Sequence, residues 1–295
     1  MITIWSCHTY QCDGECGNTE VLNDLETELG TVVTFDNIED RKEHLQSSDD
    51  LLTVDVIVWD LVSVAEPVTV DADRINQMFA NINAAYEPVG IQFRMLKSNV
   101  YTDYFTFEDL AEDNYEKYYF EIIQNNSESI IDLYLVDHEK GLCFIDGNTR
   151  GCQKGKGFTS TGGWTSSIVI AKDDITDMKI PTHEFGHFFN LEHTFKGYDE
   201  KVNHDSCDAI GDYICDTPAD PGDGYGAMVN YTDCEMYGVF DEEGIAYKPM
   251  INNYMGYFSA CYMTPYAFTQ GQIDRMKTFI YDEKRIGYLK TSEEL

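Results

Sequence analysis

The stretch HEFGHFFNLEH, residues 183–193, constrains this chain most, because it gathers three of only seven histidines within a few turns of chain. Residues four apart on a helix share one face, so His183 and His187 can both point at one metal ion. Glu184 faces a neighbouring direction, from which its carboxylate can reach a water on the ion without binding the ion itself. The stretch therefore predicts a helix that carries two metal ligands and a general base.

The third histidine requires a change of chain direction. His193 lies six residues after His187 and would face away from it on a continuing helix. Asn190 stands where the helix must end, and asparagine tolerates the left-handed conformation that ends helices. Three neutral imidazoles then leave one tetrahedral position open, which is typical of a catalytic Zn2+ site rather than a structural one. The alternative is a chance pattern on a buried helix, which the third histidine and the helix breaker disfavour.

The chemistry expected at such a site is hydrolysis. Zinc lowers the pKa of a bound water to about 7 and polarises a carbonyl group. Glu184 would accept the proton of the attacking water and pass it to the leaving amine. The pattern thus predicts a zinc-dependent endopeptidase that forms no covalent intermediate. Two alternatives stay open: a catalytically inactive, zinc-bearing secreted binding protein, which the intact Glu184 disfavours, and a zinc hydrolase of a non-peptide amide or ester.

The charge balance excludes several partners. Among 295 residues, 53 are acidic and 20 basic, a formal net charge of −33. Such a field repels nucleic acid and anionic membranes, and it favours cations, including Ca2+, and basic or neutral ligands. A solvated acidic surface without a specific partner is the simpler explanation. No apolar run approaches the roughly 18 residues of a membrane span, so we expect no membrane partner. Separately, we expect the chain to be a monomer.

The nine cysteines are better explained by disulfides than by a metal knuckle, because no pair has C-x-x-C spacing. Disulfides indicate a secreted or extracellular protein, although the first residues lack the pattern of a signal peptide. Three cysteines, Cys7, Cys12 and Cys16, lie near the start. An N-terminal disulfide loop is the favoured explanation for these three.

The periodicity predicts a mixed α/β layer followed by an irregular region. Expected strands cover 51–64, 91–96, 130–137 and 167–171, and expected helices cover 71–90, 105–126 and 269–286. Asp71 or Asp73 would cap the first of these helices. We expect an N-terminal extension or possible pro-segment over 1–50 and a catalytic domain over 51–290. That domain divides into an upper subdomain, 51–193, and a lower one, 194–290.

The pattern H-E-x-x-H-x-x-N-x-x-H resembles that of the metzincin metallopeptidases, whose motif usually has Gly where Asn190 stands. The resemblance implies an α+β zincin fold, with a twisted mixed sheet, an active-site helix and a disulfide-stapled lower subdomain. It implies that Met255, in NNYMGY, forms the methionine turn beneath the zinc, although ordinary core is the alternative. It also implies that Tyr257 approaches the zinc or the oxyanion, with Tyr254, Tyr262 and Tyr266 as rivals.

A finer resemblance, carried by GDYICDTP, NNYMGY and FTQGQIDRM, is to the pappalysin branch of metzincins. It implies a calcium site at Asp212 and Thr217, with Asp216 as an added candidate; aspartates that cap turns are the alternative. It also implies disulfides that pair Cys234 with Cys261 and Cys207 with Cys215, although four cysteines allow three pairings. The wider metzincin resemblance implies a further alternative, in which Cys7, Cys12 or Cys16 blocks the zinc as a ligand from a pro-segment.

The substrate expected from the resemblance is an extended polypeptide. In metzincins the segment corresponding to GFTSTGGW (157–164) is the edge strand that binds substrate through main-chain hydrogen bonds; an ordinary loop is the alternative. Phe258, Ser259 and Ala260, after the methionine, include no acid, so we expect no preference for Arg or Lys after the cut. We expect His8, His44, His138 and His204 to be surface or satisfied histidines, with His204 the only rival ligand.

Overall fold

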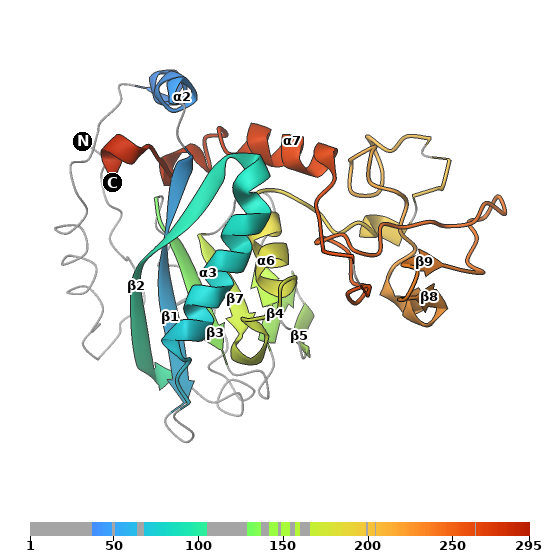
Figure 1. Cartoon of the computed structure of the whole chain (residues 1–295), viewed down its shortest axis with the longest axis horizontal. Helices are drawn as coiled ribbons and strands as arrows, with labels where there is room; N and C mark the ends of the chain where they lie inside the picture. Colours follow the sequence, from blue (N-terminus) through green and yellow to red (C-terminus); the bar gives the residue numbers. More distant parts are fainter. Residues whose placement is uncertain are drawn as a thin grey trace.

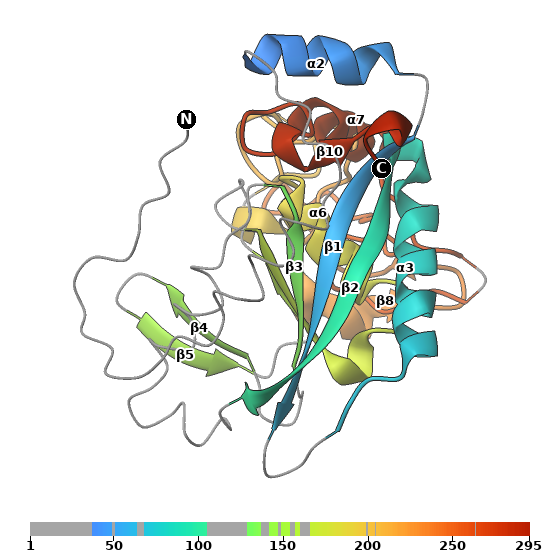
Figure 2. The same ribbon diagram turned by 90° about the vertical axis from the view of Figure 1, so that its left-hand side faces the viewer.

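The structure, a computed structural model, describes residues 37–48, 51–63, 68–104, 129–136, 142–146, 149–153, 157–159, 166–198, 200–203, 205–262 and 264–295. Its centre is a mixed sheet (Figures 1 and 2). The parallel strands are β1 (Leu52–Ser63), β2 (Ile91–Tyr104), β3 (Ile131–Val136) and β7 (Ser167–Ala171), in the order β2-β1-β3-β7. Two antiparallel strands complete the sheet: β6 (Gly157–Thr159) beside β7, and β10 (Leu289–Lys290) beside the start of β1. The α+β class with a mixed sheet is confirmed.

The remaining elements are short or lie outside the sheet. The α-helices are α2 (Ile38–Ser47), α3 (Ala72–Tyr86), α6 (Ile180–Phe188) and α7 (Gln270–Phe279). Two hairpins pair β4 (Leu142–Asp146) with β5 (Thr149–Gln153) and β8 (Val229–Asn230) with β9 (Glu235–Met236). Short 3-10 helices in the described part of the chain are η1 (Glu87–Val89), η5 (Lys172–Asp174), η6 (Lys196–Tyr198), η7 (Asp223–Met228), η8 (Ile286–Tyr288) and η9 (Ser292–Glu294).

Helix α3 shows how the sequence pattern becomes a layer. Its apolar residues Ile75, Met78, Phe79 and Ile82 recur at helical spacing and are buried against the sheet. Asp71 caps the helix by accepting a 2.7 Å hydrogen bond from the Asp73 backbone N–H. The helix therefore lies along one face of the sheet beside α6 (Figure 1).

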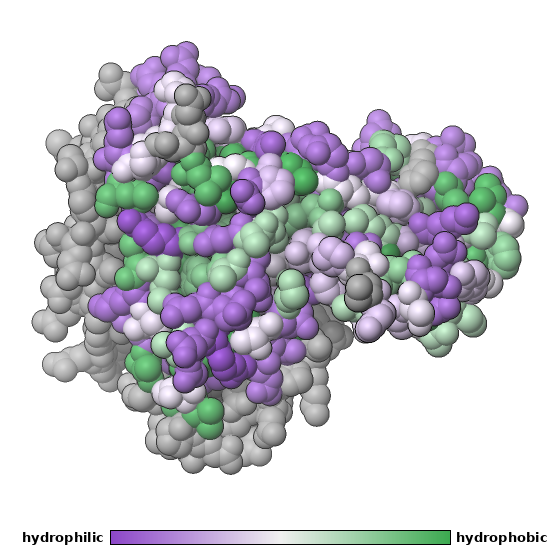
Figure 3. Space-filling view, in the orientation of Figure 1, coloured by the Kyte–Doolittle hydropathy of each residue, from purple (hydrophilic) through white to green (hydrophobic). Residues whose placement is uncertain are grey.

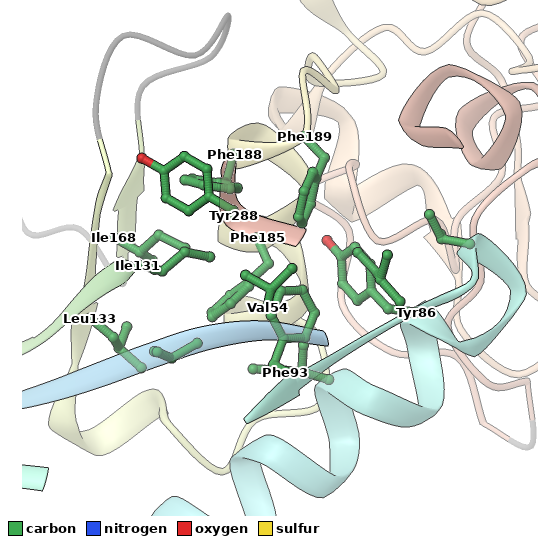
Figure 4. Close-up of a cluster of buried hydrophobic side chains, with 14 of the residues drawn as sticks. Val54, Tyr86, Phe93, Ile131, Leu133, Ile168, Phe185, Phe188, Phe189 and Tyr288 are labelled. Atoms are coloured by element: carbon green, nitrogen blue, oxygen red, sulfur yellow. The ribbon is translucent and has the colours of Figure 1, made fainter. Parts of the chain in front are cut away.

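The core lies between the sheet and helix α6. Phe185 and Phe188 of this helix are fully buried, as is Phe189 at its C-cap. Phe93 of β2 meets Phe185 edge-to-face, with 4.6 Å between the ring centroids. Figure 4 shows these rings together with Val54 and Tyr86. Packing on this cluster fixes the helix that carries the histidines, because close-packed aromatic rings leave it little freedom to move.

Some expected elements differ in extent. Strand β2 continues to Tyr104, well beyond the predicted end at residue 96. The last helix ends at Phe279 rather than at residue 286, because Asp282 accepts the Lys284 backbone N–H in a local turn that competes with the helix. The helix predicted over 105–126 and the three N-terminal cysteines lie outside the described residues.

The end of the predicted N-terminal extension packs on the catalytic part. In α2, Leu45 is buried, and Arg41 forms an ion pair with Glu294 near the C-terminus. Hydrophilic residues cover much of the face seen in Figure 3, as the charge balance requires. None of the helices that the structure describes is long and apolar enough to cross a membrane.

One buried carboxylate gives the fold a testable pH dependence. Asp132 of β3 is 6% exposed and accepts hydrogen bonds from Trp59 Nε1 at 2.9 Å and Ser166 Oγ at 3.3 Å, while burial raises its pKa to about 6. This value lies above that of an unfolded aspartate, so Asp132 favours folding at low pH and loses this contribution as pH rises through 6. We expect Asp132→Asn to be about 1–2 kcal/mol more stable than the parent at pH 8 and equal to it at pH 4, in urea unfolding. A stability difference independent of pH would contradict this.

Candidate metal centre

Helix α6 brings two of the predicted ligands into the interior. It begins with Pro181 in its first turn, where the missing N–H costs nothing, and every residue from Pro181 to Phe188 is buried. His183, Glu184 and His187 are each 6% exposed. A short helix without a polar face is stabilised by its surroundings, so its position is set by the core described above.

The three histidines of the motif converge on one point. The Nε2 atoms of His183 and His187 are 3.1 Å apart, and the Nε2 atom of His193 lies 3.1 Å from the first and 3.0 Å from the second. Among the described residues, these three histidines form the one group of possible metal ligands whose ligand atoms all lie within 4.8 Å of one another. Nitrogen atoms this close can be shared by one zinc ion with bonds of about 2.0–2.1 Å, so the donor set fits zinc.

The surroundings of the imidazoles favour their metal-binding form. His183 donates its Nδ1 hydrogen to the Tyr254 carbonyl at 2.7 Å, and His187 does the same to the Leu191 carbonyl at 2.8 Å. Each Nε2 lone pair is then free to bind a metal. Burial lowers the pKa of all three rings, that of His193 to about 3, so the ligands are neutral at physiological pH.

The predicted bend occurs at Asn190. Its φ is +67°, its N–H bonds to the His187 carbonyl at 2.9 Å, and the Leu191 N–H bonds to the Gly186 carbonyl at 3.0 Å. This is the pattern of a Schellman motif with Asn190 in the left-handed position. The chain reverses there and returns His193 to the other two histidines.

This turn gives a matched pair of substitutions at Asn190. We expect Asn190→Gly to unfold in urea at or slightly above the parent midpoint, because glycine adopts φ of +67° without strain. Asn190→Val should lose about 1–2 kcal/mol and bind zinc more weakly in chelator competition, because a β-branched residue resists this conformation. Equal stability of the two variants would mean that the left-handed turn does not position His193.

Glu184 lies against the edge strand of the sheet. A Cβ atom at Gly157 of β6 would come within 2.5 Å of its Oε1 atom, so the glycine lets the strand backbone approach the carboxylate. Burial raises the pKa of Glu184 to about 8, and the nearby Thr159 hydroxyl offsets part of this rise. The carboxyl group lies next to His183 on the same helix, a position from which it can accept and return a proton.

The segment 254–258 forms the floor of the site. The Sδ atom of Met255 lies so close to Gly186 that a Cβ there would meet it at 2.5 Å. Tyr257 is 49% exposed, and its ring centroid lies 4.7 Å from that of His193 and 5.7 Å from that of His183. Met255 and Tyr257 therefore both lie next to the histidine helix or the histidine rings, and their roles as methionine turn and oxyanion partner stay predictions.

Comparisons with known proteins agree with this geometry. A family model described as "Pregnancy-associated plasma protein-A" (peptidase M43) matches residues 167–281, and one described as "Metallo-peptidase family M12B Reprolysin-like" matches residues 72–194. Together they cover α3, the strands β2, β3, β6 and β7, the histidine motif and the methionine segment. The chain is a metzincin-type metallopeptidase.

Fungal proteins are among the relatives of this metallopeptidase. An "Extracellular metalloprotease" of Sordaria macrospora is 29% identical over 217 residues, which cover 71% of this chain and 67% of the relative. A similarly named protein of Neurospora crassa has the same identity and coverage. Another, from Verticillium alfalfae, is 37% identical over 101 residues, 34% of this chain and 30% of the relative.

Four cysteines between residues 207 and 261 are bonded in pairs in this metallopeptidase. Disulfides join Cys207 to Cys215 and Cys234 to Cys261, the pairing that the resemblance implied. The second lies in a small buried cluster with Val229, Met236, Val239, Ile251 and Phe258. This cluster ties the β8–β9 hairpin to the segment that follows the methionine turn.

Two of the three calcium candidates, Asp212 and Thr217, are buried, and the third, Asp216, is exposed. Asp212 is buried, and its Oδ2 atom has no hydrogen-bond partner among the described residues. Thr217 is fully buried, and its hydroxyl oxygen lies 3.5 Å from that of Thr269. Asp216 is exposed and accepts hydrogen bonds from Thr269 Oγ1 and the Gly271 N–H at the start of α7. Asp216 is thus engaged as a helix cap, the alternative use of an aspartate foreseen from the sequence.

Two contributors to the site were not identified from the sequence. Lys179 donates a 2.7 Å hydrogen bond to the Phe258 carbonyl and so ties the start of α6 to the segment after Met255. It lies four residues before His183, so the helical spacing could have revealed it. The contact of Gly157 with Glu184 had no comparable signal. His44 lies near Glu294, with its Nε2 atom 4.0 Å from the carboxylate, while His8, His138 and His204 lie outside the described residues.

Proposed function

We propose that this metallopeptidase is a secreted zinc endopeptidase in which Glu184 is the general base. The observation that carries the proposal is the convergence of three neutral imidazoles within 3.1 Å, with a buried carboxylate beside them on the same helix. Metallopeptidase families and relatives named as extracellular proteases support both the activity and the compartment.

The residues divide the chemistry among them. His183, His187 and His193 hold the ion, which supplies a Lewis acid for the peptide carbonyl and for water. Glu184 takes the proton of the attacking water and returns it to the leaving nitrogen, because its carboxylate lies beside the histidines on the same helix. Tyr257 donates its hydroxyl hydrogen to the carbonyl oxygen as negative charge develops there.

The substrate we propose is a polypeptide in extended conformation. Strand β6 lies at the sheet edge among the described strands, beside Glu184, and its backbone can pair with an added strand. A non-peptide amide would gain nothing from such an edge. We propose a monomer as the acting unit, and the net charge of −33 disfavours nucleic acid and anionic membranes as partners.

The test is cleavage of a denatured, disordered protein by the purified chain, mapped by mass spectrometry. A parallel sample contains a zinc chelator, and zinc is then added back. Cleavage that is lost with chelator and recovered with zinc supports the endopeptidase. Cleavage that resists the chelator, or a chain that binds zinc but cleaves neither peptides nor small amides, contradicts it. The second result favours a binding protein.

We further propose that Asp212 and Thr217 hold a Ca2+ ion, with Glu200 as an additional ligand. The buried Oδ2 atom of Asp212 lacks a hydrogen bond, and Glu200 is close enough to the 211–212 backbone for a Cβ at Gly211 to collide with its carboxylate. Carboxylate and hydroxyl oxygens are the ligands that Ca2+ prefers. Asp216 stays outside this ligand set, because it caps α7.

The calcium proposal predicts a change in thermal stability. We expect 1 mM Ca2+ to raise the Tm of the parent by several degrees, as ligand binding to the native state does, and we expect Asp212→Asn to abolish this rise. Asp216→Asn is the matched control: it should lower Tm through loss of the cap but keep the calcium-induced rise. A rise that survives in Asp212→Asn, or is absent from the parent, would contradict the site.

A further inference from the structure

Aromatic rings connect the third histidine to the surface of the metallopeptidase. The ring of Phe195 lies parallel to that of His193, with centroids 4.9 Å apart and an interplanar angle of 10°. Tyr257 meets Phe195 edge-to-face at 4.7 Å, and Tyr198 packs on Phe195 at 5.4 Å. Phe195 is 6% exposed, whereas Tyr257 is 49% and Tyr198 is 65% exposed. The cluster thus has a buried centre and two accessible rings.

The backbone holds Tyr198 in this exposed position at a cost. Gly197 and Tyr198 have φ values of +77° and +55°, so a tyrosine adopts the left-handed conformation that non-glycine residues usually avoid. Such strain persists only where surrounding contacts impose it, and it is most common at functional sites.

One of the contacts that hold Tyr198 comes from Gly222. Tyr198 lies against Gly222, where a Cβ atom would meet its Cε1 atom at 2.5 Å, and Gly222 itself has φ of +92°. A glycine is therefore required for the ring to lie so close to the chain. The ring is held on two sides, by Phe195 and Gly222, while most of its surface faces solvent. A preorganised exposed aromatic ring can bind a partner with little loss of conformational entropy.

We infer that Tyr198, with Phe195 and Tyr257, forms a substrate subsite that binds an aromatic or large aliphatic side chain of the peptide. This inference rests on the proposed endopeptidase function. The ring distances of 5.4 and 4.9 Å put Tyr198 within about three extended residues of His193. A peptide that crosses the metal centre reaches the ring with a side chain close to the scissile bond.

Cleavage profiling of a peptide library tests the subsite with four chains. The parent should favour aromatic or large aliphatic side chains at one position near the cut. Tyr198→Ala should lower that preference at least fivefold and leave the other positions unchanged, while Tyr198→Phe should keep it. Tyr237→Ala is the control, because Tyr237 is 52% exposed beside β9 and its hydroxyl donates to Asp233 and Glu235 of its own hairpin.

The outcomes separate the subsite from the catalytic proposal. An unchanged profile in Tyr198→Ala, with the parent active, overturns the subsite alone. An equal loss in Tyr237→Ala overturns it too, because the effect would then be general. If the parent cleaves no peptide, the endopeptidase function is overturned and the subsite with it. Urea unfolding of Tyr198→Ala should show one cooperative transition like that of the parent, which establishes that the variant folds.

Discussion

Replacing Glu184 by glutamine is expected to lower kcat/KM for peptide cleavage by about 10²–10⁴-fold while the chain still binds one zinc ion. Glutamine has nearly the same shape as glutamate, so Gly157 can still approach it and the helix keeps its packing. An amide cannot accept the proton of the attacking water. The loss should fall on kcat, because Glu184 acts on the reacting water rather than on substrate binding.

The matched control is Glu192→Gln in the same motif. Glu192 is partly exposed and pairs with Lys196, four residues later, so its replacement changes the charge near His193 without touching the reacting groups. We expect activity within about twofold of the parent, because exposed ion pairs contribute little. Metal content from atomic absorption completes the measurement. Full activity in Glu184→Gln would refute the assigned base, and a chain without metal would show that Glu184 is needed for the site to form.

The sequence predicted the parts of this site that depend on local periodicity. The positions of His183, His187 and Glu184 follow from helical geometry, and the return of His193 follows from the tolerance of Asn190 for a left-handed conformation. These predictions need only the spacing of residues that are close together in the sequence. The same holds for α3, whose apolar spacing and Asp71 cap both appear in the structure.

Contacts between distant segments could not be predicted in this way. The approach of Gly157 to Glu184, and the bond from Lys179 to the Phe258 carbonyl, join residues 27 and 79 positions apart. They depend on how β6 and the methionine segment pack against α6. The use of Asp216 as a cap for α7 is a third case, because the competing calcium and capping interpretations involve the same side chain.

Replacing Gln272 by leucine is expected to lower stability by about 2–3 kcal/mol and to weaken zinc binding about 10–100-fold, although Gln272 does not touch the metal ligands. Gln272 of α7 and Asn253 exchange two amide hydrogen bonds, of 3.0 and 3.1 Å, and both side chains are fully buried. Leucine would leave the Asn253 amide buried without this partner.

The effect should reach the metal through the methionine turn. Asn253 Oδ1 also accepts the Met255 N–H at 2.8 Å, and the neighbouring Tyr254 carbonyl accepts the Nδ1 hydrogen of His183 at 2.7 Å. Gln272 therefore fixes Asn253, and Asn253 fixes the turn that orients a zinc ligand. A shift of this carbonyl would allow the His183 ring to rotate, which weakens the site without removing a ligand.

Urea unfolding of the metal-free chain and chelator competition measure the two effects separately. Gln270→Leu is the control, because Gln270 lies on the same helix but is exposed and bonds only to Asp274. We expect this control to stay within about 0.5 kcal/mol of the parent and to bind zinc normally. A Gln272→Leu chain that loses stability but binds zinc as tightly as the parent would show that α7 supports the fold without orienting His183. Loss of both properties in Gln272→Leu alone would establish α7 as the element that holds the methionine turn in register with the histidines.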